Sequence, residues 1–227
     1  MHTNRVVPNR EELMKKAAFV ALCVGLLVPS AAIAAVLDFS TGTGGAGGTV
    51  VDIGGGDAMG FDIRIDTLVV SGAGAFDGVY NVDGAVACAT GGGASCGALS
   101  FDTSTGTLSI VGSVPALGVP LTTLLSGTID SFMFFPSTTS AAMFASGADT
   151  KVPILLTSLG LNPSSPYSFI GSSLSFGPAV VCEGGSCYTA ISTDILNTEV
   201  PIPEPGTLLL LGSGLLGLAR RARKRNG

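Results

Sequence analysis

Residues 61–66 read Phe-Asp-Ile-Arg-Ile-Asp, and this stretch indicates the fold more clearly than any other part of the chain. Its apolar residues occupy every second position and alternate strictly with charged ones. Such a period of two predicts a half-buried β-strand, with Phe61, Ile63 and Ile65 on the core face. Residues 68–70, Leu-Val-Val, predict that the chain continues into a second strand.

Short apolar runs continue on both sides of this stretch, separated by Gly-rich, Asp-Gly and Thr-Gly turns. Residues 36–51 are rich in Gly and Thr and predict an edge strand with loops. The other expected strands cover 79–82, 86–88, 98–101, 107–111, 127–135, 167–176, 179–182 and 188–195. Many short strands joined by Gly and Pro turns predict an all-β fold, either an antiparallel sandwich or a flattened barrel.

One segment departs from the β pattern and predicts a short helix near residues 150–160. Asp149 and Thr150 offer N-capping side chains, Pro153 is tolerated in a first helical turn, and Gly160 is a typical stop. The apolar positions of this expected helix are Val152, Leu155, Leu156 and Leu159.

The N-terminal end has the three parts of a secretory signal peptide. Lys15 and Lys16 precede an uncharged apolar run at 17–28, and small residues follow at Ala32 and Ala34. A positive region, an apolar region of this length and an Ala-x-Ala site predict cleavage by signal peptidase after Ala34. The alternative to a signal peptide is that the apolar run forms a buried core helix. Met14, directly before the two lysines, is the expected start of translation.

The C-terminal end combines a proline ladder, a short apolar run and a basic cluster. The run at 207–219 is about 20 Å long as a helix, against a hydrocarbon core of about 30 Å, which favours a transient anchor over a permanent span. Basic residues beside an apolar helix stay in the cytoplasm, so the bulk of the chain is expected outside. The expected anchor and basic stop comprise Leu208, Leu211, Leu215, Leu218, Arg220, Arg221, Arg223, Lys224 and Arg225.

These three parts together resemble the PEP-CTERM sorting signal of exported bacterial proteins. The likeness rests on Val200-Pro-Ile-Pro-Glu-Pro-Gly-Thr207, the Leu/Gly run and the basic end. It implies recognition by the membrane protease exosortase, cleavage near the sorting motif, and a cell-surface or matrix location in bacteria that make exopolysaccharide. The implied sorting motif comprises Val200, Pro201, Pro203, Glu204 and Pro205. An ordinary tail anchor is the alternative.

We therefore expect three parts: a signal peptide at 1–34, a Gly-rich β domain at 35–199 and a sorting tail at 200–227. Nine of the eleven basic residues lie in the two ends, which leaves Arg64 and Lys151 against thirteen acidic residues in the β domain, a net charge of −11. Nucleic-acid binding requires a basic surface, so we exclude that class of function.

Four cysteines remain in the expected mature chain, in two close pairs that each bracket a Gly-rich segment. An even number of cysteines in an exported protein implies disulfides. Local pairing predicts Cys88–Cys96 and Cys182–Cys187, although four cysteines permit three pairings. Zinc binding is a weak alternative, because paired CxxC spacing and histidine ligands are both missing.

The residue inventory argues against catalysis. His2 is the only histidine and lies in the expected signal peptide, so Ser-His-Asp and Cys-His nucleophile systems are excluded from the mature chain. A glycosidase needs two carboxylates, but Glu183 and Glu199 are the only glutamates at 35–199, and tryptophan is absent. A calcium site formed by Asp52, Asp57 and Asp62 does not have EF-hand spacing. We expect no metal and no cofactor.

The function favoured by the sequence is therefore a non-catalytic protein of the cell surface or of the exopolysaccharide matrix. Its expected partners are signal peptidase and exosortase during export, a membrane that anchors it transiently, and exopolysaccharide. A carbohydrate-binding module or adhesin is the principal alternative, and a secreted polysaccharide hydrolase is a third.

Overall fold

The computed structural model describes residues 34–42, 46–88, 95–182, 185–200 and 213–214. The chain divides into two compact units, Met1–Ile33 and Ala34–Gly227, and the first lies outside the described residues. The β domain occupies Ala34–Val200 of the second unit. It consists mostly of β-strands with one short α-helix, so the predicted all-β class is confirmed.

Thirteen strands make up the described part of the domain. They are β1 Val36–Ser40, β2 Thr49–Gly54, β3 Asp57–Ile65, β4 Thr67–Ser71, β5 Gly78–Asn81, β6 Val86–Ala87, β7 Ser95–Asp102, β8 Thr107–Val114, β9 Val119–Pro136, β10 Ala141–Lys151, β11 Tyr167–Phe176, β12 Val180–Cys182 and β13 Gly185–Glu199. Two 3-10 turns lie at Gly74–Phe76 and Pro115–Leu117, and the helix α2 spans Pro153–Ser158.

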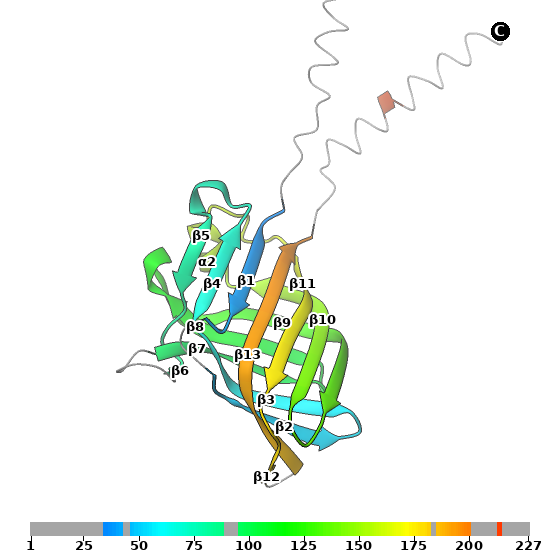
Figure 1. Ribbon diagram of the computed structural model, residues 1–227. Coiled ribbons are helices and arrows are strands. Elements are labelled where there is room, and N and C mark those ends of the chain that lie inside the picture. Colours follow the sequence, from blue (N-terminus) through cyan, green and yellow to red (C-terminus); the bar gives the residue numbers. More distant parts are fainter. Residues whose placement is uncertain (1–33, 43–45, 89–94, 183–184, 201–212, 215–227) are drawn as a thin grey trace, which may run out of the picture. The chain divides into compact units, whose positions relative to one another are not determined.

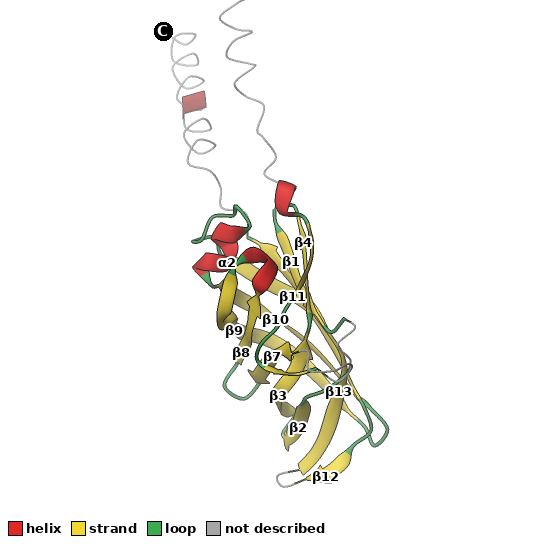
Figure 2. Ribbon diagram, turned by 90° about the vertical axis from the view of Figure 1, so that its left-hand side faces the viewer, coloured by secondary structure: helices red, strands yellow, loops and turns green. Residues whose placement is uncertain are grey.

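Hydrogen bonding between the strands closes the main sheet on itself. The order β11-β10-β9-β8-β7-β3-β2-β13 returns to its start because β13 also pairs with β11. Every pairing in this ring is antiparallel, and because the ring is closed, each of its strands has a partner on both sides. Figure 2 shows α2 beside β9 at one end of the sheet, where the Val152 amide donates to the Leu124 carbonyl.

Strand β13 is 15 residues long and is paired along both edges. One edge pairs first with β2 and then with β1, and the other pairs with β12 and then β11. Figure 1 shows β13, in orange, between β1 in blue and β11 in yellow. From β1 the sheet extends through β4 to β5. The last strand before the C-terminal tail is therefore an interior strand of the fold.

The core lies inside the closed sheet and follows the period of two. In β8, Leu108, Ile110 and Val114 are buried, whereas the residues between them are partly or fully exposed, except for buried Gly112. Each large apolar side chain removed from water stabilises the fold by about 1.5–3 kcal/mol. The largest fully buried side chains are Tyr167, Phe39, Phe169, Phe176, Leu37, Ile63, Ile65, Leu68, Leu99, Ile110, Leu124 and Leu125.

The strand at residues 61–66 is present, but its predicted face is wrong at Phe61. Ile63 and Ile65 are fully buried, whereas Phe61 is 44% exposed. The pairing of β3 with β7 shifts register between Gly60 and Ile63, and Asp62 has a φ of 52°. A β-bulge places an extra residue in one strand, and here it turns Phe61 from the core to the solvent-facing side.

Two further predictions need correction. Residues 36–51 do not form an edge strand, since β1 lies between β13 and β4, and β2 lies between β13 and β3. The helix is present as α2, but Asp149 and Thr150 belong to β10 and do not cap it; Val152 is the N-cap residue, without a side-chain bond. Gly160 does end the segment, with a φ of 69°.

The expected membrane helix at 207–219 lies outside the described residues, apart from Ser213 and Gly214. Within the described ranges, no helix has the length and apolar character needed to cross a membrane. The expected signal peptide at 1–34 likewise lies outside them, except for Ala34.

Candidate functional site

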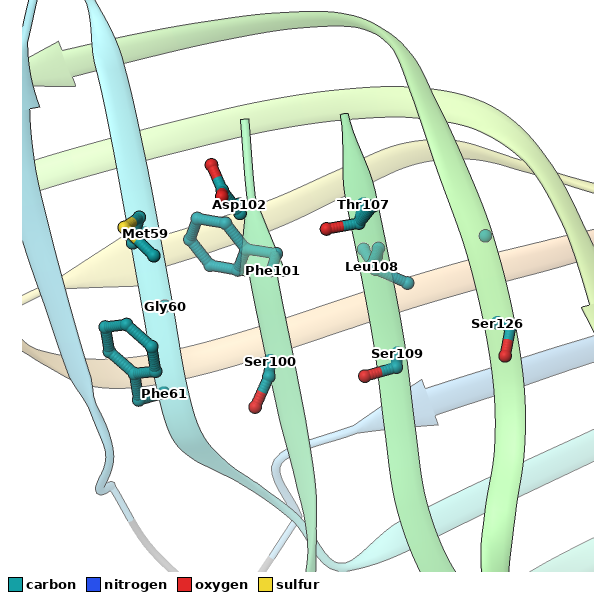
Figure 3. A pocket seen from close by; sticks show the side chains of 11 residues that line it. Met59, Gly60, Phe61, Ser100, Phe101, Asp102, Thr107, Leu108, Ser109 and Ser126 are labelled. Carbon is teal, nitrogen blue, oxygen red and sulfur yellow. The ribbon is translucent and has the colours of Figure 1, made fainter. Parts of the chain in front are cut away.

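A shallow groove of about 400 Å³ lies on the solvent-facing side of β3, β7, β8 and β9. Figure 3 shows its lining side chains on these neighbouring strands. They are Met59, Phe61, Ser100, Asp102, Thr107, Ser109 and Ser126, with Gly60, Phe101, Leu108 and Gly127 completing the lining. Apart from Asp102 these residues are uncharged, in a domain with strong negative charge.

Hydroxyl side chains cross this face in register. Ser100 pairs with Ser109, Ser109 with Ser126, and Ser126 with Thr150, so four adjacent strands each contribute one hydroxyl. We call Ser100, Ser109, Ser126 and Thr150 the hydroxyl row; Figure 3 shows its first three members. Directly opposed residues in a sheet lie about 4.5–5.5 Å apart, so the row presents evenly spaced donors and acceptors.

An exposed aromatic ring lies beside the hydroxyl row. Phe61 projects from β3 next to Ser100 in Figure 3, at the position to which the bulge turns it. Asp102 adds the only carboxylate of the lining. The Ser104 hydroxyl donates to it at 2.7 Å and lowers the pKa of Asp102 below its ordinary value, so this group is held as an anion. The groove thus combines an apolar ring, hydroxyls and one acceptor.

A second polar cluster is buried inside the closed sheet. Lys151 donates to the neighbouring Asp149 carboxylate and, at 3.2 Å, to Oδ1 of Asn197, and its ammonium lies 4.7 Å from the centre of the Tyr167 ring. All four residues are at most 5% exposed. Burial lowers the pKa of Lys151 to about 8, although Asp149 opposes this shift, and burial raises the pKa of Asp149 above its ordinary value.

A pair of carboxyl groups joins β1 to β13. Burial, and then a hydrogen bond and charge repulsion from Asp194, raise the pKa of Asp38 to about 7. Asp194 is exposed and Asp38 is half-buried. Two adjacent carboxyl groups can serve acid–base chemistry, but the groove on β3, β7, β8 and β9 does not include this pair.

The four expected cysteines form disulfides in the described structure. Cys88 is joined to Cys96 and Cys182 to Cys187, the two local pairs expected from the spacing, with Cα atoms 5.3 and 5.9 Å apart. The first bridges the segment after β6 to β7, and the second joins β12 to β13.

The expected calcium ligands are not brought together. Asp52 accepts from the Gly54 amide at 2.9 Å, Asp57 accepts from Thr103 at 3.0 Å, and Asp62 occupies the bulge. Across the described ranges, no three His, Cys, Asp or Glu residues are grouped so that they could hold a metal ion.

The structure describes the inner boundaries of the two targeting segments and, of the remaining tail, Ser213 and Gly214. Ala34 directly precedes β1, and the amide of Val200 donates to the Pro166 carbonyl at 2.9 Å after β13 ends. Ala32 and the remaining residues of the sorting motif and anchor lie outside the described residues: Pro201, Pro203, Glu204, Pro205, Leu208, Leu211, Leu215, Leu218, Arg220, Arg221, Arg223, Lys224 and Arg225.

Neither the groove nor the buried cluster is predicted from the sequence. Both depend on strand pairing between distant segments. In addition, the sequence predicts no strand at Ala141–Lys151, because the alternating apolar positions there include the small residues Ala141 and Ala145. One signal was available: Lys151 is one of only two basic residues between the targeting ends.

Comparison with known protein families matches residues 201–224 to the PEP-CTERM protein-sorting motif. The match lies within the expected tail at 200–227 and begins directly after Val200, so the C-terminal segment carries a PEP-CTERM sorting signal of an exosortase substrate. No curated protein and no solved structure matches the chain.

Proposed function

We propose that this protein is a non-catalytic component of the cell surface or of the exopolysaccharide matrix, delivered there by exosortase. The sorting signal supports an exported, exosortase-processed protein. Beyond this, the proposal is that the protein resides in the matrix, catalyses no reaction and is anchored in the membrane only transiently. In this account signal peptidase removes residues 1–34 and exosortase removes the tail.

The observation that carries the proposal is the boundary at Val200. The fold uses β13 up to Glu199, and the Val200 amide still bonds to Pro166. The sorting motif begins at the next residue. Alternating prolines at 201, 203 and 205 cannot continue a strand ladder, because proline lacks the backbone donor. Cleavage after this boundary leaves every described hydrogen bond of the domain intact.

The test is a pair of single substitutions in the full chain, expressed in an exosortase-containing bacterium. Glu204→Ala changes the centre of the Pro-Glu-Pro element, and Ile202→Ala is the matched control in the same stretch. We expect Glu204→Ala to accumulate uncut protein in the membrane fraction, while Ile202→Ala reaches the matrix fraction like the wild type. Equal processing of both variants would contradict the proposal.

A carbohydrate-binding role is the second candidate, favoured by the groove. The exposed ring of Phe61 offers a hydrophobic contact for the face of a sugar, and the adjoining hydroxyl row offers hydrogen-bond partners. The domain carries a net charge of −11, so it should repel acidic polysaccharides. A neutral glycan is therefore the expected ligand.

Calorimetric titration with neutral and with acidic polysaccharide tests this candidate. Phe61→Ala should weaken binding of the neutral glycan at least tenfold, whereas Phe135→Ala, which removes another exposed phenylalanine outside the groove, should not. Absence of saturable binding by the wild type would leave the groove without this role.

A further inference from the structure

We propose that Lys151 and Asn197 join covalently, forming an intramolecular amide between β10 and β13 with release of ammonia, and that Asp149 is the acid–base group of this reaction. The three side chains belong to the buried cluster described above. The sorting function does not require such a bond, and the contacts that favour it lie in the β domain, outside the tail.

The two reacting side chains are in contact. Nζ of Lys151 lies 3.2 Å from Oδ1 of Asn197, and that oxygen is bonded to the carboxamide carbon Cγ that an amine would attack. Reaction requires the amine nitrogen to move from this hydrogen-bonded position to within about 3–3.5 Å of Cγ, a short shift between side chains already in contact. The Asn197 amide nitrogen donates to the Leu37 carbonyl at 2.9 Å and to the Ile195 carbonyl at 2.7 Å. These bonds fix the orientation of the carboxamide.

The surroundings exclude water. Asn197 and Phe169, which pairs with it on β11, are fully buried, as is Leu37, which pairs with it on β1. Lys151 is 5% exposed, next to the Tyr167 ring. An enclosed site of this kind prevents hydrolysis and favours uncharged reactants over ions.

The protonation state required for the reaction agrees with the burial. Attack requires a neutral amine, and burial lowers the pKa of Lys151 to about 8. Acid catalysis requires a protonated carboxyl group, and burial raises the pKa of Asp149. The Oδ2 atom of Asp149 is buried without a hydrogen-bond partner among the described residues. Burying an unpaired oxygen costs more free energy when the carboxyl group is ionised than when it is protonated. Transfer of one proton from Lys151 to Asp149 produces both reactants.

The atoms balance without an oxidant or other co-reactant. The Nζ lone pair of neutral Lys151 forms a bond to Cγ of Asn197 while protonated Asp149 supplies a proton to the carboxamide. The bond from Cγ to Nδ2 then breaks, and Nδ2 departs as ammonia with a proton that Asp149 has relayed from the lysine nitrogen. The products are a secondary amide, free ammonia and an Asp149 carboxyl group restored to its starting form.

The position of the bond gives it a mechanical role. Asn197 lies three residues before Val200, the point at which the sorting tail begins. A force applied through that end would peel β13 away from its neighbours, beginning at Glu199. A covalent link from Asn197 to β10, which lies on the far side of β11, would stop this separation at Asn197, near the end of β13. The Cys182–Cys187 disulfide lies at the opposite end of β13.

The experiment is mass spectrometry of the reduced, exported protein, followed by trypsin digestion. We expect a mass about 17 Da below that of the processed sequence, the mass of one ammonia. Trypsin should cut after Arg64 but not after Lys151, the only other basic site in the domain. A second protease should release a branched peptide that contains both Lys151 and Asn197.

Variants separate the proposal from its alternatives. Lys151→Arg and Asp149→Asn should restore the full mass, and Asn81→Ala, which changes an exposed amide on β5, should leave the deficit in place. The wild-type result decides the matter even if a cluster variant fails to fold. Full mass with normal cleavage after Lys151 would overturn the proposal, leaving a buried ion pair. A deficit confined to an unbranched Asn197 peptide would also overturn it, because that indicates a succinimide.

Discussion

The backbone nitrogen of Ala35 lies 3.4 Å from Oε2 of Glu199, and the amide of Glu199 donates to the Ala35 carbonyl at 3.0 Å. The other Glu199 oxygen accepts from the Ser165 hydroxyl at 2.6 Å. The first residue after the expected signal-peptide cleavage therefore meets the last residue of β13. Removal of residues 1–34 would convert the Ala35 nitrogen into an ammonium group beside this carboxylate.

Glu199→Gln should thus destabilise the mature domain by about 1 kcal/mol, because it removes the charge opposite the new terminus. The free energy of unfolding from urea titration measures the effect. In a chain with residues retained before Ala35, the same substitution should cost less, since the nitrogen is then an uncharged amide. An equal cost in both chains would show that the terminal charge plays no part.

Asp38 should make the domain less stable as the pH rises. Its pKa is raised to about 7 from 3.8, so between these values the folded state holds a proton that the unfolded state has lost. Stability therefore falls from about pH 4 to about pH 7. At pH 8 the free energy of unfolding of Asp38→Asn should exceed that of the wild type by about 1 kcal/mol after solvent screening, and this difference should disappear at pH 4.

Asp102 provides the control with the opposite sign. The Ser104 hydroxyl lowers the pKa of Asp102, so its stabilising contribution is present above the ordinary pKa and is lost as the pH falls through the lowered one. The Asp102→Asn variant should be less stable than the wild type at pH 7, and the stabilities of the two proteins should become equal in acid. Melting curves across this range test both substitutions, and parallel pH trends for the two variants would refute the assignment.

Gly147→Ala should disrupt the pairing of β9 with β10. Both pairings of β10 shift register next to Gly147, and a Cβ there would overlap the backbone carbonyl of Thr128. We expect a loss of about 2–3 kcal/mol, as in an overpacked core. Gly78→Ala is the matched control, because its nearest neighbour would be the Tyr80 hydroxyl at an ordinary 3.7 Å. Similar losses in both variants would contradict this explanation.

Replacing Cys182 and Cys187 together by serine should cost about 2–3 kcal/mol, the loop-closure contribution of a short disulfide. The effect should be greatest in the β12–β13 hairpin and in β2, which pairs with residues 186–189 of β13. Hydrogen exchange measures it strand by strand. Non-reducing peptide mapping of the wild type should recover both local pairs, and a Cys88–Cys187 peptide would contradict them.

The sequence was sufficient for the features that depend on local pattern. Alternation at Leu108 and Ile110 identifies β8 because each strand residue simply faces the core or the solvent. The short helix is recognisable because Pro153 and Gly160 mark its ends. The tail is recognisable because its three parts occur in order within one short segment.

Features created by long-range pairing could not be predicted in this way. The bulge at Phe61 depends on how β3 fits against β7, and no local signal reveals that shift of face. The contact between Lys151 and Asn197 joins residues 46 positions apart, on β10 and β13, and it forms only because β11 pairs with both strands when the sheet closes. The sequence predicts Asp149 as a helix cap because Asp is a common N-cap residue, and the local sequence does not distinguish that role from a buried carboxyl group paired with Lys151.

The most direct test of the central claim is the C-terminal peptide of the protein recovered from the cell surface, with exosortase present or deleted. With exosortase, the account predicts a chain that ends near Pro201–Pro205 and lacks residues 207–225. Without it, the account predicts a membrane-bound chain that keeps the basic end. Surface protein that retains Arg220–Arg225 in exosortase-containing cells would contradict the account.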